Sequence, residues 1–256
     1  MIDRNINKFR KSLKRGKALI GGWIQISNSN IAEMMSDADY SWIAFDMEHG
    51  SFSTGDLPDL FRAVELKNKL PLVRLPNKNK EICGQVLDAG SAGVIVPNIK
   101  DEFELKTIVN ACNLPPHGSR GVGYSRSNLF GKKFTKYKKQ KNKPIVIAMI
   151  ENILSVKRLE KILLVKGLDA ILVGPYDLSA SMNLTGQFEN KDFIAVLDEI
   201  IQLCTKFNIP TGYHVVTQDD GLLKKKIDEV KMSDEANKVA NKELDRLGRI
   251  SPQSPE

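Results

Sequence analysis

Short apolar runs rich in isoleucine, valine and alanine recur along this chain, and segments with helical periodicity separate them. This alternation is typical of repeated β–α units around a parallel sheet. The chain has 256 residues, of which 41% are hydrophobic, so it is long and apolar enough for one barrel-sized domain and too apolar to be disordered. The predicted strands are 18–26, 40–45, 70–75, 92–97, 144–150, 168–173 and 209–215. The predicted helices are 31–38, 57–68, 80–89, 102–112, 153–165 and 191–208.

The positive charge of the chain is concentrated in two segments. The formal net charge is +7, from 38 basic and 31 acidic residues, and the excess lies in the first seventeen residues and in 132–143. The second segment interleaves lysines with Phe134 and Tyr137, a composition that nucleic-acid-binding surfaces share. It matches no known nucleic-acid-binding module, so we interpret it as a solvated loop within 114–143 and predict no nucleic-acid partner.

The cysteines and the hydropathy pattern bear on the cell compartment. Cys83, Cys112 and Cys204 are odd in number and widely spaced, which favours free thiols over a disulfide framework or a zinc site. The charged N-terminal segment lacks the apolar run of a signal peptide, and no apolar run approaches the roughly 18 residues of a membrane span. We therefore expect a soluble protein of the reducing cytoplasm with no membrane partner.

Polar residues at the carboxyl ends of the predicted strands are the candidates for function, because that end of a β/α barrel carries the chemistry. Two of them, Glu151 and Asp177, would lie at the mouths of adjacent strands. A pair of carboxylates suits a hard divalent cation, although each acid could instead cap a helix. The complete set selected by this rule is Trp23, Asp46, Glu48, His49, Arg74, Glu151 and Asp177.

His49 and Arg74 have two interpretations each. His49 is flanked by acids and could act as a general base, or it could be a loop histidine bonded to a carbonyl. Arg74 ends an apolar run, where its charge could face an anionic substrate or form a salt bridge with Asp46, Glu48 or Asp88. No lysine lies inside a predicted strand, which favours metal-assisted carbonyl chemistry over an imine mechanism.

Several blocks in a fixed order give the chain a family resemblance from about Gly16 to Leu223. With them the sequence resembles the HpcH/HpaI aldolases, metal-dependent (β/α)₈ TIM barrels that cleave 4-hydroxy-2-oxo acids to pyruvate and an aldehyde. The blocks are Gly22-Trp23 with Ala32-Glu33, Asp46 with Glu48-His49-Gly50, Arg74, Leu87-Asp88-Ala89-Gly90 with Gly93 and Pro97, Pro115-Pro116 with Gly118 and Arg120-Gly121, Ile150-Glu151, and Gly174-Pro175-Tyr176-Asp177-Leu178-Ser179.

The resemblance implies a role for each candidate residue. Glu151 and Asp177 match the ligands of a divalent metal (Mg²⁺, Mn²⁺ or Co²⁺), His49 the general base, and Arg74 the group that stabilises the pyruvate enolate. Asp88 and Asp46 match acids that support the histidine and the metal-bound waters, and Glu48 belongs to the same outer set. Trp23, Gly174, Pro175 and Tyr176 are expected to contact substrate, with the N–H groups near Tyr176 and Asp177 receiving its carboxylate.

The chain departs from the family pattern at three places. Met149 stands where many members have glutamine, and Asn183 where glycine is usual. The eighth strand and the final helix are not recognisable after about Glu229, so we predict an aldolase domain at 1–223 and a tail at 224–256 that resembles a helical linker of Lon protease. An intact relative is expected to be a homo-oligomer. The alternatives are a related lyase of a dicarboxylate or acyl-CoA ester, and a truncated, inactive barrel.

Overall fold

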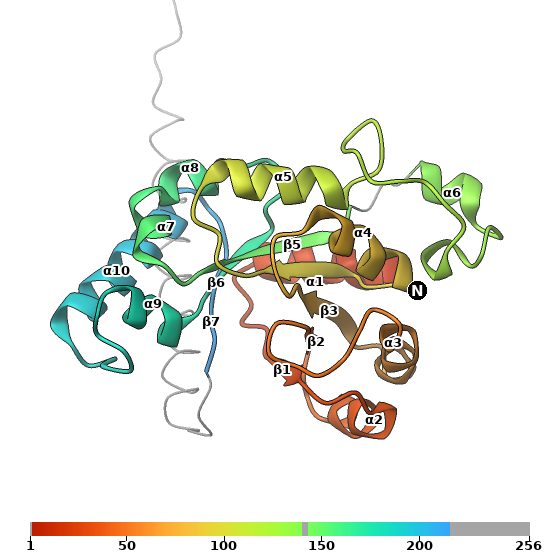
Figure 1. The fold of residues 1–256 in the computed structure, drawn as a ribbon, viewed down its shortest axis with the longest axis horizontal. Helices are drawn as coiled ribbons and strands as arrows, with labels where there is room; N and C mark the ends of the chain where they lie inside the picture. The colour runs from red at the N-terminus through yellow and green to blue at the C-terminus, as the bar shows by residue number, and fades with distance from the viewer. Residues whose placement is uncertain (1, 140–142, 216–256) are drawn as a thin grey trace, which may run out of the picture.

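The computed structural model describes residues 2–139 and 143–215, and within them a parallel sheet is surrounded by helices (Figure 1). The Lon-like tail lies outside the described residues. The strands are β1 (Gly21–Ile24), β2 (Trp42–Asp46), β3 (Leu70–Arg74), β4 (Gly93–Val96), β5 (Ile145–Ile150), β6 (Ala170–Val173) and β7 (Thr211–Tyr213). The helices are α1 (Ile2–Lys14), α2 (Ser29–Asp37), α3 (Leu57–Leu66), α4 (Lys80–Ala89), α5 (Glu102–Cys112), the 3₁₀ turn η1 (Arg126–Asn128), α6 (Phe134–Lys138), α7 (Ile153–Lys157), α8 (Leu159–Leu163), α9 (Pro175–Ser181) and α10 (Lys191–Lys206).

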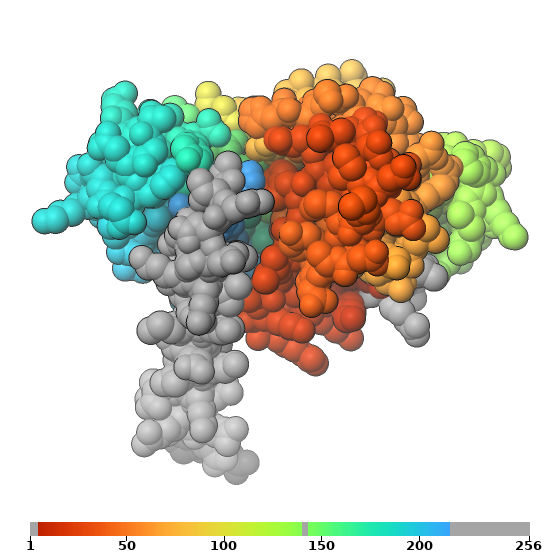
Figure 2. All heavy atoms as spheres, turned by 90° about the horizontal axis from the view of Figure 1, so that it is seen from below, coloured from red at the N-terminus to blue at the C-terminus, as the bar shows by residue number. Residues whose placement is uncertain are grey.

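The strands form one sheet in sequence order, and every neighbouring pair is parallel. Helices connect consecutive strands along the outside, as β–α units require. The space-filling view in Figure 2 shows the red-to-orange N-terminal segments and the cyan segments around α9 and α10 on opposite sides of one face. The predicted α/β class is confirmed as a curled parallel sheet of seven strands, whereas a complete eight-stranded barrel is not shown by the described residues.

Alternation along the strands divides the core into two layers. Ile43 and Phe45 of β2 pack with the surrounding helices, while Ala44 between them packs on the inner face with Leu72 and Met149. Successive side chains of a strand point to opposite faces, so a strand buried on both faces reads as one continuous apolar run. This is why the predicted strands were recognisable although none alternates between apolar and polar residues.

Helix α1 lies against the inner layer, at a place where the sequence predicted no helix. Its residues Ile6 and Phe9 are buried in the inner cluster, and Leu13 packs beside them. Arg10 donates to Asp169 at 2.6 and 2.8 Å and to the carbonyls of residues 143 and 144 at 2.7 and 2.9 Å. The segment is therefore an amphipathic helix whose lysines face outward, not only a basic stretch.

Replacing Phe9 by alanine should test how much this contact stabilises the fold. Phe9 is 7% exposed, so the change leaves a cavity in the inner layer, and we expect a loss of about 3 kcal/mol in the free energy of unfolding. Urea denaturation measures the loss. The exposed neighbour Lys8→Ala serves as control and should change stability by less than about 0.5 kcal/mol. Equal stability of the two variants would contradict the packing of α1.

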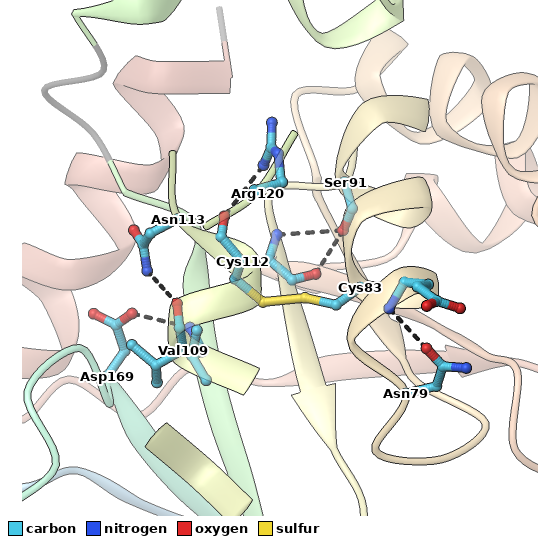
Figure 3. Close-up of a disulfide and its surroundings, with 11 residues drawn as sticks. Asn79, Cys83, Ser91, Val109, Cys112, Asn113, Arg120 and Asp169 are labelled. Carbon is cyan, nitrogen blue, oxygen red and sulfur yellow. Dashed lines mark hydrogen bonds between the residues drawn. A yellow bond between two sulfur atoms is a disulfide. The ribbon is translucent and has the colours of Figure 1, made fainter. Parts of the chain in front are cut away.

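The prediction of free thiols is wrong for two of the cysteines. Cys83 of α4 and Cys112 of α5 form a disulfide with their Cα atoms 5.9 Å apart (Figure 3), whereas Cys204 is free and buried. The two partners are separated by 29 residues, so no local spacing indicates the bond. The packing of α4 against α5 brings them together.

Other differences concern the ends and breaks of elements. The predicted helix 153–165 is two short helices, α7 and α8, separated at Arg158, and the predicted loop 114–143 contains η1 and α6. In Figure 1, α6 projects away from the sheet on the right. Helix α9 was not predicted. In the part of the chain that the structure describes, no helix has the length and apolar character needed to cross a membrane.

Candidate active site

An open cavity of about 300 Å³ is formed by residues that follow several strands at their carboxyl ends. It brings together four of the residues selected from the sequence, which come from the ends of β2, β5 and β6. Three further polar residues complete its wall. The lining residues are Glu48, His49, Asn98, Glu151, Asn152, Asp177 and Ser181.

Glu151 is the buried carboxylate of this cavity, with 5% of its surface exposed. Its Oε1 accepts a hydrogen bond of 2.5 Å from the backbone N–H of Asn98, and its buried Oε2 has no hydrogen-bond partner among residues 2–139 and 143–215. The pKa of Glu151 is raised to about 7, mainly by burial and in smaller part by the nearby Glu48 and Asp177, while the Asn98 hydrogen bond acts in the opposite direction. A Cβ on Gly174 would lie 2.5 Å from Oε2, so the glycine leaves room for this oxygen.

Asp177 supplies the second carboxylate from the first turn of α9, where its side chain is exposed. The capping alternative does not account for Glu151, because Asn152 is the residue that caps α7, through its bond to the Leu154 N–H. No cluster of three or more His, Cys, Asp or Glu side chains arranged to hold a metal is found in 2–139 and 143–215. A magnesium ion needs only one or two protein carboxylates, and the partnerless Oε2 of Glu151 meets that requirement, so these residues fit a divalent cation.

Arg74 and Asp46 form a buried ion pair beside the cavity. The Nε and Nη2 atoms of Arg74 donate to the two oxygens of Asp46 at 2.8 and 2.6 Å, and Gln25 donates to the same carboxylate at 2.8 Å. Burial disfavours the ionised form of Asp46, but the bonds from Arg74 and Gln25 outweigh it and hold the pKa below its usual value. Arg74 also forms an ion pair with Glu48, whose Oε2 lies 3.2 Å from Nη1, and Glu48 lines the cavity wall. Of the three salt-bridge partners considered from sequence, the structure pairs Arg74 with Asp46 and Glu48 and not with Asp88.

His49 lies at the rim of the cavity with an exposed side chain. Its backbone N–H and that of Glu48 donate to Asp46 Oδ1 at 3.2 and 3.1 Å. The turn then closes at Gly50, where an added Cβ would lie 3.0 Å from the carbonyl oxygen of Gln25 and would also collide with that of Asp46. The carboxylate of Asp46 therefore both shapes the turn that carries His49, by accepting two main-chain N–H groups, and binds Arg74.

The ring of Trp23 on β1 contacts both Arg74 and His214. The Arg74 guanidinium carbon is 5.0 Å from the centre of its ring, and the His214 ring stacks on it at 4.4 Å. His214 directly follows β7, and its backbone N–H donates to the Val173 carbonyl at 3.0 Å. The pKa of His214 is lowered to about 4, mainly by burial and in smaller part by the charge of Arg74. His214 was not among the site residues predicted from the sequence.

This depressed pKa has a consequence for stability. Unfolded His214 takes up a proton below its ordinary pKa of about 6.5, while the folded protein resists protonation until about pH 4, so stability falls as the pH decreases through this window. Between pH 7.5 and 5.0, we expect the free energy of unfolding of wild type to fall by about 2 kcal/mol more than that of His214→Phe, since the phenyl ring stacks but does not titrate. Urea midpoints at the two pH values measure the difference. Parallel losses in both proteins would contradict it.

Asp88 is not one of the residues that line the cavity. It lies on α4, and its carboxylate is 3.5 Å from Arg120 Nη2, 3.4 Å from Ser125 and 3.4 Å from the Tyr137 hydroxyl. Burial raises its pKa against the attraction of Arg120. Its catalytic assignment stays a prediction.

The substrate-contact residues expected on α9 begin that helix. Gly174 is the N-cap residue, Pro175 is buried in the first turn, and the exposed ring of Tyr176 packs edge-on against Phe188 at 4.9 Å. Their contact with substrate also stays a prediction.

Three polar residues at strand ends were missed, and each has a simple reason. Gln25 and His214 directly follow β1 and β7, but the predicted strands 18–26 and 209–215 ran through them and hid them as strand residues. Asn98 comes soon after β4. It contacts Glu151 through its main-chain N–H, so its side-chain type gives no sign of this role.

Comparison with known proteins places this geometry in a family. The sequence profile of the HpcH/HpaI aldolase/citrate lyase family matches residues 19–233. The chain is 31% identical over 225 residues to a hydroxypyruvate/pyruvate aldolase of Roseobacter denitrificans, covering 87% of each chain. It is 30% identical over 225 residues to a 4-hydroxy-2-oxovalerate aldolase of Novosphingobium aromaticivorans, covering 87% of this chain and 85% of the relative.

A solved structure shares the fold of this chain. An HpcH/HpaI aldolase/citrate lyase family protein of Burkholderia cenocepacia superposes with a TM-score of 0.82 at 24% identity, covering 94% of this chain and 99% of the other. The profile match spans most of the sequence and includes every cavity-lining residue. This chain is therefore an enzyme that belongs to the HpcH/HpaI aldolase/citrate lyase family.

Proposed function

We propose that this enzyme reversibly cleaves a 4-hydroxy-2-oxo acid to pyruvate and an aldehyde, with a divalent cation held by Glu151 and Asp177. The observation that carries the proposal is the buried, partnerless Oε2 of Glu151 in a cavity that also contains Asp177 and His49. The names of the two relatives support the substrate class, because both are aldolases of short oxo acids. A bound Mg²⁺, Mn²⁺ or Co²⁺ would polarise the 2-oxo group of the substrate.

The residues of the chain supply the proton transfer and the charge balance. His49 at the rim accepts the proton of the 4-hydroxyl group as the C3–C4 bond breaks, and the electron pair of that bond passes to the pyruvate fragment. A proton returned to C3 completes pyruvate, while C4 leaves as the aldehyde carbon.

The positive charge of Arg74 favours this step because negative charge develops on the pyruvate fragment. Arg74 is held in place by Asp46, which itself accepts from Gln25, so the guanidinium needs no rearrangement during the reaction. Gly174 and the N–H groups at the start of α9 are the proposed contacts of the substrate carboxylate.

Exchange of the pyruvate methyl protons with D₂O, followed by NMR, tests this function without knowledge of the aldehyde. We expect exchange with the full chain and Mg²⁺, and its loss when EDTA is added. Absence of exchange from a protein that unfolds cooperatively in urea would contradict the proposal and favour the inactive-barrel alternative. The homo-oligomer and the cytoplasmic location stay predictions.

A further inference from the structure

The turn between β4 and α5 holds the N–H group that contacts Glu151. Asn98 adopts a left-handed backbone conformation with φ of 46°, which few residues other than glycine and asparagine tolerate. The N–H of this residue donates to Glu151 Oε1 at 2.5 Å. A left-handed residue of this kind persists only where its surroundings hold it.

Two side chains from different elements hold this turn. Lys78, which precedes α4, donates from Nζ to the Asn98 carbonyl at 3.0 Å and to Glu104 Oε1 at 2.7 Å. Glu104, in the first turn of α5, also accepts the backbone N–H of Lys100 at 2.8 Å through its other oxygen. The ion pair therefore contacts the turn on both sides of Ile99, and both side chains are about 30% exposed.

These contacts determine which oxygen of Glu151 remains open. Oε1 is occupied by the Asn98 N–H, so Oε2 is left next to Gly174 without a partner. If the turn relaxed, Asn98 would withdraw its N–H and the carboxylate could rotate. Groups that orient a metal ligand in this way are commonly worth ten- to a hundredfold in metal affinity.

We infer that Lys78 and Glu104 are positioning residues of the cation site, acting on Glu151 through the main chain of Asn98. The inference rests on the proposed cation site and adds to it two residues outside the cavity wall. Within the described residues, no hydrogen bond or ion pair joins Lys78 or Glu104 to Glu151, so their effect passes through the main chain on the two sides of Asn98.

Binding of Mn²⁺ to the full chain, followed by the EPR signal of the free ion, tests the inference without an activity assay. We expect Glu104→Ala to weaken Mn²⁺ binding by about tenfold or more, and Lys78→Met to weaken it in the same direction. Lys78→Arg keeps a donor at the turn and should restore most of the affinity. Amide hydrogen exchange at Asn98, measured without cation, should be faster in the first two variants than in wild type.

Glu102→Ala is the matched control, since Glu102 begins the same helix and, in the described part of the chain, its side chain bonds to Arg158 at 2.8 Å and forms no hydrogen bond with the turn. We expect Glu102→Ala to lower the free energy of unfolding about as much as Glu104→Ala does and to leave the Mn²⁺ affinity unchanged. Wild-type affinity in Glu104→Ala, or equal losses in Glu102→Ala and Glu104→Ala, would overturn the inference alone. Failure of wild type to bind Mn²⁺ would instead overturn the cation site, and the inference with it.

Discussion

Glu151→Gln is expected to reduce Mg²⁺-dependent exchange of the pyruvate methyl protons by about a thousandfold or more. The amide keeps the size of the side chain and can still accept the Asn98 N–H, but it removes the buried negative charge from the cavity. Polarisation by a metal contributes several kcal/mol to such reactions, and about 4 kcal/mol corresponds to a thousandfold. NMR rates of the two proteins at equal Mg²⁺ concentration measure the loss.

The same variant should be more stable than wild type when no cation is present. Because burial raises the pKa of Glu151 to about 7, the unfolded chain ionises this carboxyl more readily than the folded protein, so wild-type stability falls progressively as the pH rises from about 4.5 to 7. Glutamine does not ionise, so at pH 8 with EDTA we expect a gain of up to about 3 kcal/mol in the free energy of unfolding. Lost exchange with lost stability would point to a folding defect, and retained exchange would remove Glu151 from the mechanism.

Arg74→Met is expected to lower the free energy of unfolding by about 3–5 kcal/mol and to abolish pyruvate exchange. Asp46 is fully buried, and the substitution leaves its charge with Gln25 and backbone N–H groups but no cation. Breaking a buried ion pair from one side costs this much because an uncompensated charge remains inside the protein. Urea denaturation at neutral pH measures the loss.

Arg158→Met is the matched control for Arg74. It removes a bidentate pair with Glu102, but Arg158 is 40% exposed, so we expect a loss of less than about 1 kcal/mol. A second variant, Arg74→Lys, keeps the positive charge but cannot form the two parallel hydrogen bonds of the planar guanidinium. It should therefore recover only part of the stability that Arg74→Met loses. If Arg74→Met cost no more than Arg158→Met, the Asp46 pair would not be the buried contact described here.

The fold class could be predicted because buried parallel strands leave a strong signal. Residues 145–150 form an unbroken apolar run, and the run is strand β5 buried on both faces. Helices α4 and α5 begin and end where expected, because Asn79 and Asp101 cap their first turns. Helix α1 was missed because polar and charged residues outnumber its apolar residues, and only the inner layer of the sheet shows what the apolar residues contact.

The sequence indicated which residues form the candidate site better than it indicated which of them contact one another. The rule that chemistry follows the strand ends selected Glu48, His49, Glu151 and Asp177, which share one cavity. It also selected Asp46 and Arg74, but it could not choose among three acids for the arginine. That choice depends on the register of β2 and β3, which sets Asp46 directly beside Arg74.

The β–α alternation, the family and the carboxylates that follow β5 and β6 can be predicted from the amino-acid order, because local apolar runs and short motifs encode them. The bond between Cys83 and Cys112 and the contact of Asn98 with Glu151 become evident only in the folded protein. Both join residues from different β–α units, and their partners lie 29 and 53 positions apart. Contacts over such separations are set by how helices and turns pack, and no local pattern in the chain records them.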